Sequence, residues 1–308
     1  MEKIKQIPKI EYVLEGGISP FATRVQTSTI EWAIERNILD APSLLKSYEN
    51  QKLGYLACRA QPYDKFSDIM LTSEYLLLVC MLDDYSEEVS TPDDFSDYSG
   101  KILNILRGMN PPIKEDDFLK GWEDWWGRVR VGTPKEWQIR IIDSISKCFE
   151  AIMWEINNRI RNIIPDVHEY VLNRQHSGSV LVCFDLVERG GMRYCPNKFR
   201  DEVFVDLVNS ASKIANWTND ILSLEKELKN GENQNLVISV HRQNKTSISD
   251  SLEHVMQMLD IELYKYTKLK NRLLTTNSSY KETVEKYIVG MEAAVRGQYE
   301  WGLRTGRY

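Results

Sequence analysis

The stretch Asn219-Asp220-Ile221-Leu222-Ser223-Leu224-Glu225-Lys226-Glu227 decides how the rest of this chain is interpreted. Asn219, Ser223 and Glu227 lie four residues apart in a helical pattern that runs from about 196 to 229. Residues at this spacing share one stripe of a helix. An amide oxygen, a hydroxyl and a carboxylate form an all-oxygen donor set, which suits Mg²⁺. Because the set carries one formal charge, we expect an anionic ligand such as a phosphate to complete it; the alternative is a polar face turned to solvent.

A second polar cluster, Asp83-Asp84-Tyr85-Ser86-Glu87-Glu88, directly follows the apolar run 75–82. A run this apolar is expected to be buried on most of its circumference, so its end opens from the core into a polar region. Asp83 and Glu87 share a helix face, and carboxylates at that spacing repel each other unless a cation screens them. The cluster therefore indicates a metal site; the alternative is an acidic helix end that frays into solvent.

Together these clusters resemble the motifs of class I terpene synthases, particularly the single-domain bacterial type. Asp83-Asp84-Tyr85-Ser86-Glu87 is similar to the family's aspartate-rich motif, and Asn219 to Glu227, with Lys226, is similar to its Asn/Ser/Glu motif. Arg174 stands close to where the family has its diphosphate-sensing arginine, and Ser177 and Gly178 follow at the positions of the linker and effector residues. The C-terminal stretch from Trp301 to Arg307-Tyr308 resembles the family's terminal tryptophan, spacer and Arg-Tyr pair.

The resemblance implies an all-α fold: a single-domain class I terpenoid synthase helical bundle around a central cavity, covering residues 1–308. It implies three Mg²⁺ ions, an isoprenyl diphosphate substrate, and these metal ligands: Asp83, Asp84, Glu87, Asn219, Ser223 and Glu227. The implied diphosphate-binding residues are Arg174, Lys226, Arg307 and Tyr308, and the implied catalytic residues are Arg174, Ser177, Gly178 and Tyr308.

The implied reaction ionises and cyclises farnesyl or geranylgeranyl diphosphate to a sesquiterpene or diterpene and releases diphosphate. Aromatic faces stabilise positive charge, so Phe184, Trp217 and Trp301 are candidates for the cavity lining, although aromatic residues also pack ordinary cores. Val79 and Cys80 lie one turn before Asp83, so we expect them to line the cavity just below the diphosphate. Their small side chains favour a farnesyl or geranylgeranyl chain over a geranyl chain.

Two alternatives stay open at this point. A chain-elongating prenyltransferase shares the first acidic motif, but such enzymes carry a second aspartate-rich motif where this chain has Asn219, Ser223 and Glu227. A catalytically silent helical scaffold with acidic faces would leave the four separated motifs without an explanation.

Composition indicates which kinds of partner and which cellular location to expect for this protein. The chain has 308 residues, 42% hydrophobic, and its net charge of −6 argues against nucleic acid as a partner. Because no apolar run is long enough to span a membrane and no signal segment follows Met1, we expect a cytoplasmic protein with no membrane partner. The five cysteines show neither metal-ligand nor disulfide spacing. A homodimer is an alternative to a monomer.

Hydrophobic periodicity predicts helices throughout, because the β-branched residues are dispersed at helical spacing. The predicted ranges are 21–37, 41–60, 65–85, 98–109, 114–129, 134–163, 165–176, 180–187, 196–229, 235–243, 247–274 and 281–302. Residues 1–20 are expected to be irregular, and 90–97 to form a loop that caps the site. Ser177-Gly178-Ser179 is expected to break a helix beside the cavity.

Overall fold

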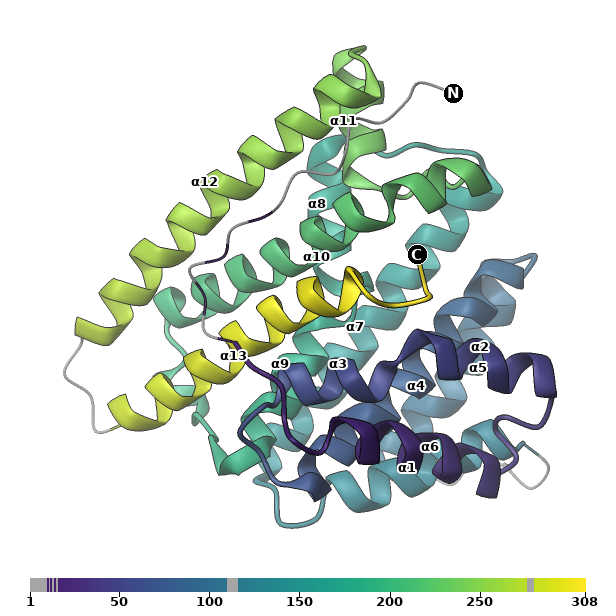
Figure 1. Ribbon diagram of the computed structural model, residues 1–308, viewed down its shortest axis with the longest axis vertical. Helices are drawn as coiled ribbons and strands as arrows, with labels where there is room; N and C mark the ends of the chain where they lie inside the picture. The colour runs from purple at the N-terminus through teal and green to yellow at the C-terminus, as the bar shows by residue number, and fades with distance from the viewer. Residues whose placement is uncertain (1–9, 11, 13, 15, 110–115, 276–279) are drawn as a thin grey trace.

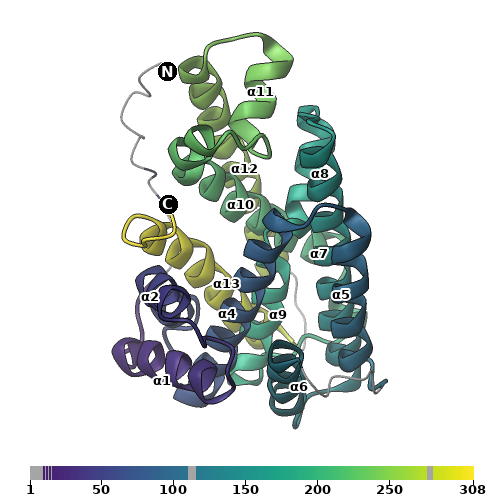
Figure 2. The ribbon, with the colours of Figure 1, turned by 90° about the vertical axis from the view of Figure 1, so that its right-hand side faces the viewer.

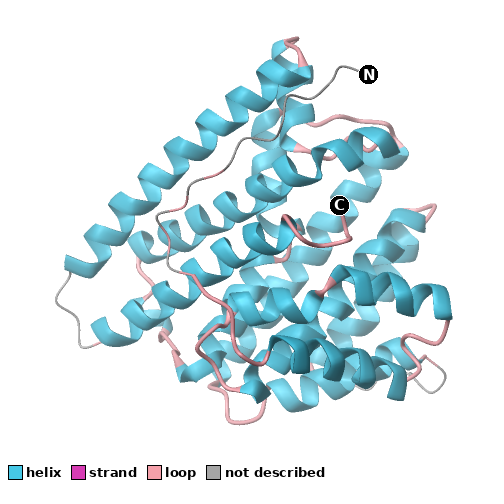
Figure 3. Cartoon of the chain, in the orientation of Figure 1, coloured by secondary structure: helices cyan, strands magenta, loops and turns pink. Residues whose placement is uncertain are grey.

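The fold is a bundle of α-helices, and no strand occurs in the part of the chain that is described (Figures 1 and 3). The computed structural model describes residues 10, 12, 14, 16–109, 116–275 and 280–308. Its helices are α1 (Ala22–Glu35), α2 (Pro42–Gln51), α3 (Leu53–Ala60), α4 (Phe66–Glu88), α5 (Pro92–Leu106), α6 (Asp117–Val129), α7 (Lys135–Ile160), α8 (Val167–Ser177), α9 (Val180–Arg189), α10 (Glu202–Asn230), α11 (Leu236–Asn244), α12 (Ile248–Thr275) and α13 (Lys281–Gly302), with 3₁₀ turns η1 (Gly190–Met192) and η2 (Asn197–Phe199). None of these helices has the length and hydropathy needed to cross a bilayer.

The helices pack in successive rows. Figure 1 shows α12 at one edge, followed by α10, α13, α3 and α1, and each of these helices contacts the next. Figure 2 shows α4 inside the bundle, near α9, with α5 and α7 beyond it. Two hydrophobic cores result, one built mainly from α1–α7 and one around α10–α13. Helix α4 contributes buried residues on all sides, as expected for an apolar central helix.

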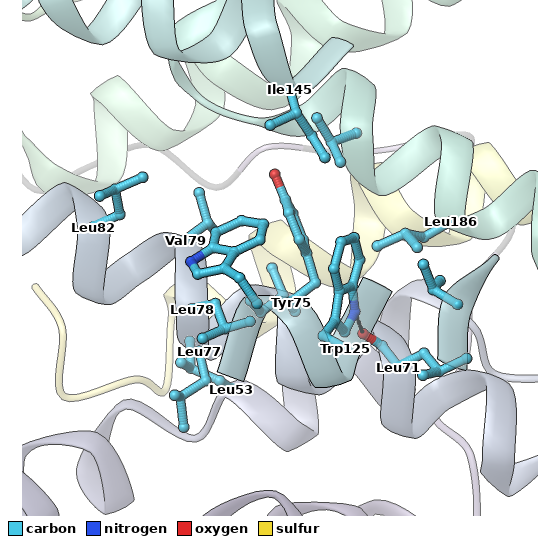
Figure 4. Packing of buried hydrophobic residues seen from close by; sticks show 14 of the residues in the cluster. Leu53, Leu71, Tyr75, Leu77, Leu78, Val79, Leu82, Trp125, Ile145 and Leu186 are labelled. Atoms are coloured by element: carbon cyan, nitrogen blue, oxygen red, sulfur yellow. Dashed lines mark hydrogen bonds between the residues drawn. The ribbon is translucent and has the colours of Figure 1, made fainter. Parts of the chain in front are cut away.

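An aromatic cluster anchors α4 in the first core (Figure 4). The fully buried ring of Tyr75 packs against Trp122 and Trp125 of α6, with ring centroids 6.0 and 5.3 Å away. Trp125 Nε1 donates a 2.8 Å hydrogen bond to the Leu71 carbonyl, so its polar atom is satisfied inside the core. This packing fixes the rotation of α4 and therefore the face on which its acidic end presents Asp83.

The single helix predicted over 41–60 is wrong, because the chain breaks at Lys52. Lys52 adopts a left-handed conformation with φ 55°, which separates α2 from α3. Tertiary contacts account for the break. Gly54 packs so closely on α1 that a Cβ would lie 2.5 Å from Gln26 Cα. Trp301 Nε1 donates to the carbonyls of Gln51 and Lys52, at 2.8 and 3.1 Å.

The loop predicted over 90–97 is also wrong. Helix α5 begins at Pro92, and the side chain of Thr91 caps it by accepting a hydrogen bond from the Asp94 amide at 3.2 Å. A Thr N-cap, proline at the first helical position and Asp93 and Asp94 in the first turn are a standard helix start. The connection from α4 to α5 is therefore only three residues long, Val89 to Thr91.

Other boundaries differ less from the predictions. The helix predicted from 196 begins at Glu202 after the η2 turn, and the break at 177–179 is confirmed between α8 and α9. The prediction for 114–115 lies outside the described residues. The described part of the N-terminal segment is irregular and covers α13: the Ile10 amide bonds to the Tyr299 hydroxyl, and Arg296 bonds to the Leu14 carbonyl at 3.0 Å.

Asp185 on α9 predicts a measurable pH dependence of stability. Burial, reinforced by the charge of Glu188, raises the pKa of Asp185 from its ordinary value of 3.8 to about 7. Between these values the folded protein holds a proton that the unfolded chain has lost, so the free energy of unfolding falls as pH rises from about 4 to about 7. Asp185→Asn should flatten this fall, which is at most about 1.4 kcal/mol per pH unit. Urea unfolding at pH 5 and pH 8 measures the effect. Asp143→Asn is the control, because Asp143 is exposed. The expectation is contradicted if the free energy of unfolding changes with pH equally in the wild type and in Asp185→Asn.

Candidate functional site

A cavity of about 170 Å³ opens between α3, α4, α7, α8, α9, α10 and α13. Its lower part is mostly apolar, and its mouth carries charged and amide side chains. The lining residues are Leu56, Ala60, Thr72, Leu76, Val79, Cys80, Asp83, Ile152, Arg174, Ser177, Gly178, Ser179, Val180, Cys183, Phe184, Ala215, Asn216, Asn219, Ala294, Val295, Gln298, Trp301, Arg307 and Tyr308. An apolar pocket with a few converging polar groups is the usual form of a small-molecule site.

The first wall of the mouth is the C-terminal end of α4. Asp83 and Asp84 each accept a hydrogen bond from one guanidinium nitrogen of Arg307, at 2.7 and 3.1 Å. The Tyr48 hydroxyl donates to the other oxygen of Asp84. The two carboxylates are 45% and 44% exposed, so they remain open to a ligand from the mouth. A single arginine thus balances the negative charge at this helix end.

The second wall is the middle of α10. Asn219 Oδ1 accepts a 2.7 Å hydrogen bond from Arg174, and Ser223 Oγ donates to the Asn219 carbonyl at 2.9 Å. Glu227 accepts a 2.7 Å hydrogen bond on one carboxylate oxygen from Asn235, the residue that caps α11. The helical spacing predicted that Asn219, Ser223 and Glu227 share a stripe. It did not predict that Glu227 would be bonded to Asn235, the cap of the following helix.

Arg174 is oriented by a buried carboxylate. Its Nε donates to Asp220 Oδ1 at 2.9 Å, and the other oxygen of Asp220 accepts from Tyr170 at 2.8 Å and from the Leu236 amide at 3.1 Å. Asp220 is fully buried, so it is a positioning group rather than an open ligand. This charge pairing holds the pKa of Arg174 well above its usual range. Arg174 therefore presents a fixed positive charge beside Asn219.

The C-terminal tail joins the two walls. Arg307 lies against Asp83 and Asp84, while the next residue, Tyr308, accepts a hydrogen bond from the Asn219 amide. Consecutive tail residues therefore touch helices whose motifs are far apart in the sequence. The tail itself is anchored by Gln51, whose side-chain oxygen accepts from Arg307 at 2.9 Å.

The donor set of the mouth fits a hard divalent cation. Within the described ranges, no three His, Cys, Asp or Glu side chains converge closely enough to hold a metal by themselves. The amide and hydroxyl oxygens of Asn219 and Ser223 belong to the set as well, and all donors are oxygens. Burial and the charge of Asp220 raise the pKa of Glu227 to about 7, and partial desolvation and the charge of Asp83 do the same for Glu87. A bound cation would relieve the desolvation and repulsion behind both shifts.

The helix break between α8 and α9 is clamped by three neighbouring helices. The Ser177 hydroxyl donates to Glu155 of α7 at 2.5 Å, and the Ser179 hydroxyl is hydrogen-bonded to Tyr75 of α4. Ser179 has φ 57°, a left-handed conformation that is costly for serine. Gly178, between them, faces Asn216 of α10. The surrounding structure therefore determines the shape of the break.

Gly178→Ala should destabilise the protein and distort the break. A Cβ at this position would lie 1.8 Å from Asn216 Oδ1, which hydrogen bonds on Nδ2 hold in place. We expect a loss of about 1–3 kcal/mol in the free energy of unfolding. Gly127→Ala in α6 is the matched control, because nothing lies within 4 Å of its Cβ position and alanine favours helices. Denaturant unfolding of both variants is the measurement, and equal stabilities would contradict the expectation.

Most of the predicted site residues line the cavity, whereas these do not: Asp84, Glu87, Ser223, Lys226, Glu227 and Trp217. The first five belong to α4 and α10, on the same helices as Asp83 and Asn219. Trp217 does not line the cavity: it is 5% exposed and packs in the α10–α13 core. Side chains two positions apart on a helix are separated by about 200° around its axis, so Trp217 and Asn219 point to opposite sides of α10. Lys226 stands at the mouth, where its charge lowers the pKa of Glu87, and no hydrogen bond from it is found among the described residues.

Sequence reasoning did not assign several supporting residues. Glu155, Tyr170 and Asn235 hold Ser177, Asp220 and Glu227. Asn235 is recognisable locally as a helix N-cap but not as a partner of Glu227, and the other two belong to no local pattern. Burial raises the pKa of Glu155 to about 7, and the charge of Arg174 and the hydrogen bond from Ser177 oppose this rise. The one feature that marks Glu155 is its burial in the middle of a helix, and the sequence does not show which acids are buried.

Comparisons with known proteins identify the family of this chain. A family model described as terpene synthase family 2, C-terminal metal binding, matches residues 74–264. The chain is 26% identical over 304 residues to a (+)-T-muurolol synthase ((2E,6E)-farnesyl diphosphate cyclizing) of Roseiflexus castenholzii, covering 97% of this chain and 93% of the relative. It is also 26% identical over 284 residues to a germacrene A synthase of Nostoc punctiforme, covering 91% and 88%.

A solved structure supports the same fold. The crystal structure of an α-eudesmol synthase superposes with a TM-score of 0.88 at 18% identity, covering 97% of this chain and 100% of that chain. The comparisons favour the terpene synthase over the chain-elongating prenyltransferase and the silent scaffold. With a matching family model that spans more than half of its length, this chain belongs to terpene synthase family 2 and has the all-α fold of class I terpene cyclases.

Proposed function

We propose that this protein ionises and cyclises farnesyl diphosphate with the help of Mg²⁺, releasing diphosphate and a sesquiterpene. The observation that carries the proposal is the joining of the two oxygen-rich walls by Arg307 and Tyr308 at the mouth of an apolar cavity. Charged groups at the mouth suit a diphosphate, and the apolar lining below suits an isoprenyl chain.

The cationic groups of the mouth bind the diphosphate in this proposal. Arg174 and Arg307 present planar forks of donors, which match phosphate oxygens, and Lys226 adds a point charge. Tyr308 contributes a hydroxyl donor. These groups stabilise the negative charge that develops on the leaving diphosphate as the allylic C–O bond breaks. Ser177 and Gly178, at the break between α8 and α9, hold the reacting end of the chain beside Arg174.

Six oxygen ligands on two helices would hold three Mg²⁺ ions: Asp83, Asp84, Glu87, Asn219, Ser223 and Glu227. Bound Mg²⁺ supplies Lewis-acid stabilisation of the diphosphate charge. Arg307 and Tyr308, which engage Asp83 and Asn219 in the structure, exchange those partners for diphosphate oxygens when the substrate binds. The tail already spans the mouth in the structure, so in this proposal the diphosphate replaces the protein partners of Arg307 and Tyr308 while the tail stays across the mouth.

The apolar part of the cavity keeps the carbocation away from bulk water. Phe184 and Trp301 line it, and aromatic faces stabilise positive charge through their quadrupoles. The name of the Roseiflexus relative specifies farnesyl diphosphate, which supports this substrate here. Geranylgeranyl diphosphate is the alternative that the small residues Val79 and Cys80 leave room for.

The test is direct incubation of the purified protein with geranyl, farnesyl and geranylgeranyl diphosphates, with Mg²⁺ or with a chelator. Gas chromatography with mass detection identifies the products, and a phosphate assay measures diphosphate release. We expect farnesyl diphosphate to give cyclic products and diphosphate only with Mg²⁺. Release of diphosphate without cyclic products, or no turnover of any substrate, would contradict the proposal.

Val79→Phe and Cys80→Phe should shift preference towards shorter diphosphates or truncate cyclisation. Both side chains line the cavity, where an added ring takes space from the substrate, although Val79 also belongs to the first hydrophobic core. We therefore expect product profiles to change while thermal stability changes little. Product analysis and a thermal melt on the same preparation check both parts.

Leu78→Phe is the control on the same helix. Leu78 is fully buried, faces Gly121 and does not line the cavity. Its added ring should overpack the core at a cost of about 1–3 kcal/mol and leave the product pattern unchanged. If Val79→Phe behaves like Leu78→Phe, the position of Val79 at the substrate is wrong.

A further inference from the structure

One face of α13 carries a polar side chain into the lower cavity. Ala294, Gln298 and Trp301 share this face, and Gln298 lies about 4.5 Å along the helix axis from Trp301, on the side away from the tail. Gly297 fixes the rotation of the helix, because a Cβ there would lie 2.8 Å from the backbone carbonyl carbon of Arg59 on α3. Gln298 is therefore held facing the cavity.

Gln298 differs from the other neutral hydroxyl and amide side chains along the lower cavity. Thr72 donates to the Gln61 side chain, the Ser179 hydroxyl is bonded to that of Tyr75, and Asn216 donates to its own helix. In the part of the chain that the structure describes, no protein group is hydrogen-bonded to the Gln298 amide. Its carbonyl oxygen and its NH₂ group are both available inside the cavity.

Gln298 is half-buried, and once substrate fills the apolar cavity its amide would lose its hydrogen bonds to water and gain none, which is unfavourable. The hydrocarbon part of an isoprenyl chain has neither donors nor acceptors, so substrate binding does not solve this problem. Keeping a water molecule on the amide does solve it, since a side-chain amide offers both a donor and an acceptor. A closed cavity filled with substrate should therefore retain a water at Gln298.

We propose that Gln298 is a specificity-determining residue: it holds a water molecule in the closed cavity, and this water captures the carbocation to give a terpene alcohol. The inference rests on the proposed function. The water oxygen forms a C–O bond with the cationic carbon, and the resulting oxonium ion loses one proton to the released diphosphate. Nothing is oxidised or reduced in this step.

The first experiment uses the wild-type enzyme with Mg²⁺ and farnesyl diphosphate in H₂¹⁸O. Mass detection should show an alcohol that carries ¹⁸O as a main product. Gln298→Leu should lower the alcohol fraction of the products about tenfold, and hydrocarbons should replace it. A tenfold change corresponds to losing about 1.4 kcal/mol of water binding at this position. Diphosphate release should continue, because Gln298 lies away from the residues that bind the diphosphate.

Two further variants separate this role from a change of shape. Gln298→Asn keeps an amide and should retain part of the alcohol, even if the leucine variant proves unstable in a thermal melt. Thr72→Val alters a lining hydroxyl that is already bonded to Gln61, so the alcohol fraction should not change.

Contrary outcomes are distinguishable from failure of the proposed function. Three outcomes overturn the role of Gln298 while the cyclase function stands. The wild type releases diphosphate but forms only hydrocarbons, its alcohol carries no ¹⁸O, or Gln298→Leu leaves the alcohol fraction unchanged. No diphosphate release from any isoprenyl substrate overturns both.

Discussion

Asp83→Ala and Asn219→Leu should each reduce turnover of the isoprenyl diphosphate by about 100-fold or more while the protein stays folded. Each change removes one proposed oxygen ligand from a different wall, and losses of this size are typical when one preorganised group at a reacting centre is removed. Folding should survive, because Arg307 keeps Asp84 and Arg174 keeps Asp220 as partners. Steady-state diphosphate release and a thermal melt are the measurements.

Neighbouring positions on α10 provide the controls. Glu225→Gln changes an exposed carboxylate whose one ion pair among the described residues is with Lys229, so activity and stability should stay close to wild type. Asp220→Asn should instead destabilise the protein, because it leaves the buried guanidinium of Arg174 without its charge partner; such losses are about 3–5 kcal/mol. If Asn219→Leu retains near wild-type turnover, the two-wall site is wrong.

Arg307→Gln should also reduce turnover by about 100-fold, because it removes a donor that we propose stabilises the departing diphosphate. Tyr308→Phe removes one hydroxyl and should have a smaller effect. Without Mg²⁺, Arg307→Gln also takes away the cation that balances Asp83 and Asp84. We therefore expect Mg²⁺ to raise the melting temperature more in this variant than in the wild type.

Arg304→Gln is the matched control in the same tail. Arg304 is exposed, and its side chain makes no hydrogen bond or ion pair within the described residues. Its replacement should leave both turnover and the effect of Mg²⁺ on melting unchanged. Equal losses in Arg304→Gln and Arg307→Gln would show that general positive charge, and not the position of Arg307, is what matters.

Local sequence was sufficient for the helical class and for the second wall of the site. The stripe formed by Asn219, Ser223 and Glu227 follows from the helical repeat alone, whichever helices surround it. Local signals were also sufficient for the start of α5, because Thr91 and Pro92 cap it, and our loop prediction gave too little weight to that pattern. The break at Gly178 was predictable for a similar reason, since Gly and Ser weaken a helix locally.

Tertiary structure decided those features of the fold and the site that depend on contacts between residues far apart in the chain. Nothing local at Lys52 predicts its left-handed conformation, which goes with the packing of Gly54 on α1 and the hydrogen bonds from Trp301 to the carbonyls of Gln51 and Lys52. The contact between Arg307 and Asp83 likewise joins residues from opposite ends of the sequence. The sequence by itself determined which chemical groups the site contains, because helical spacing is a local property. Only the packing of α4, α10 and the C-terminal tail decided that these groups meet at one cavity, because such contacts depend on the whole core.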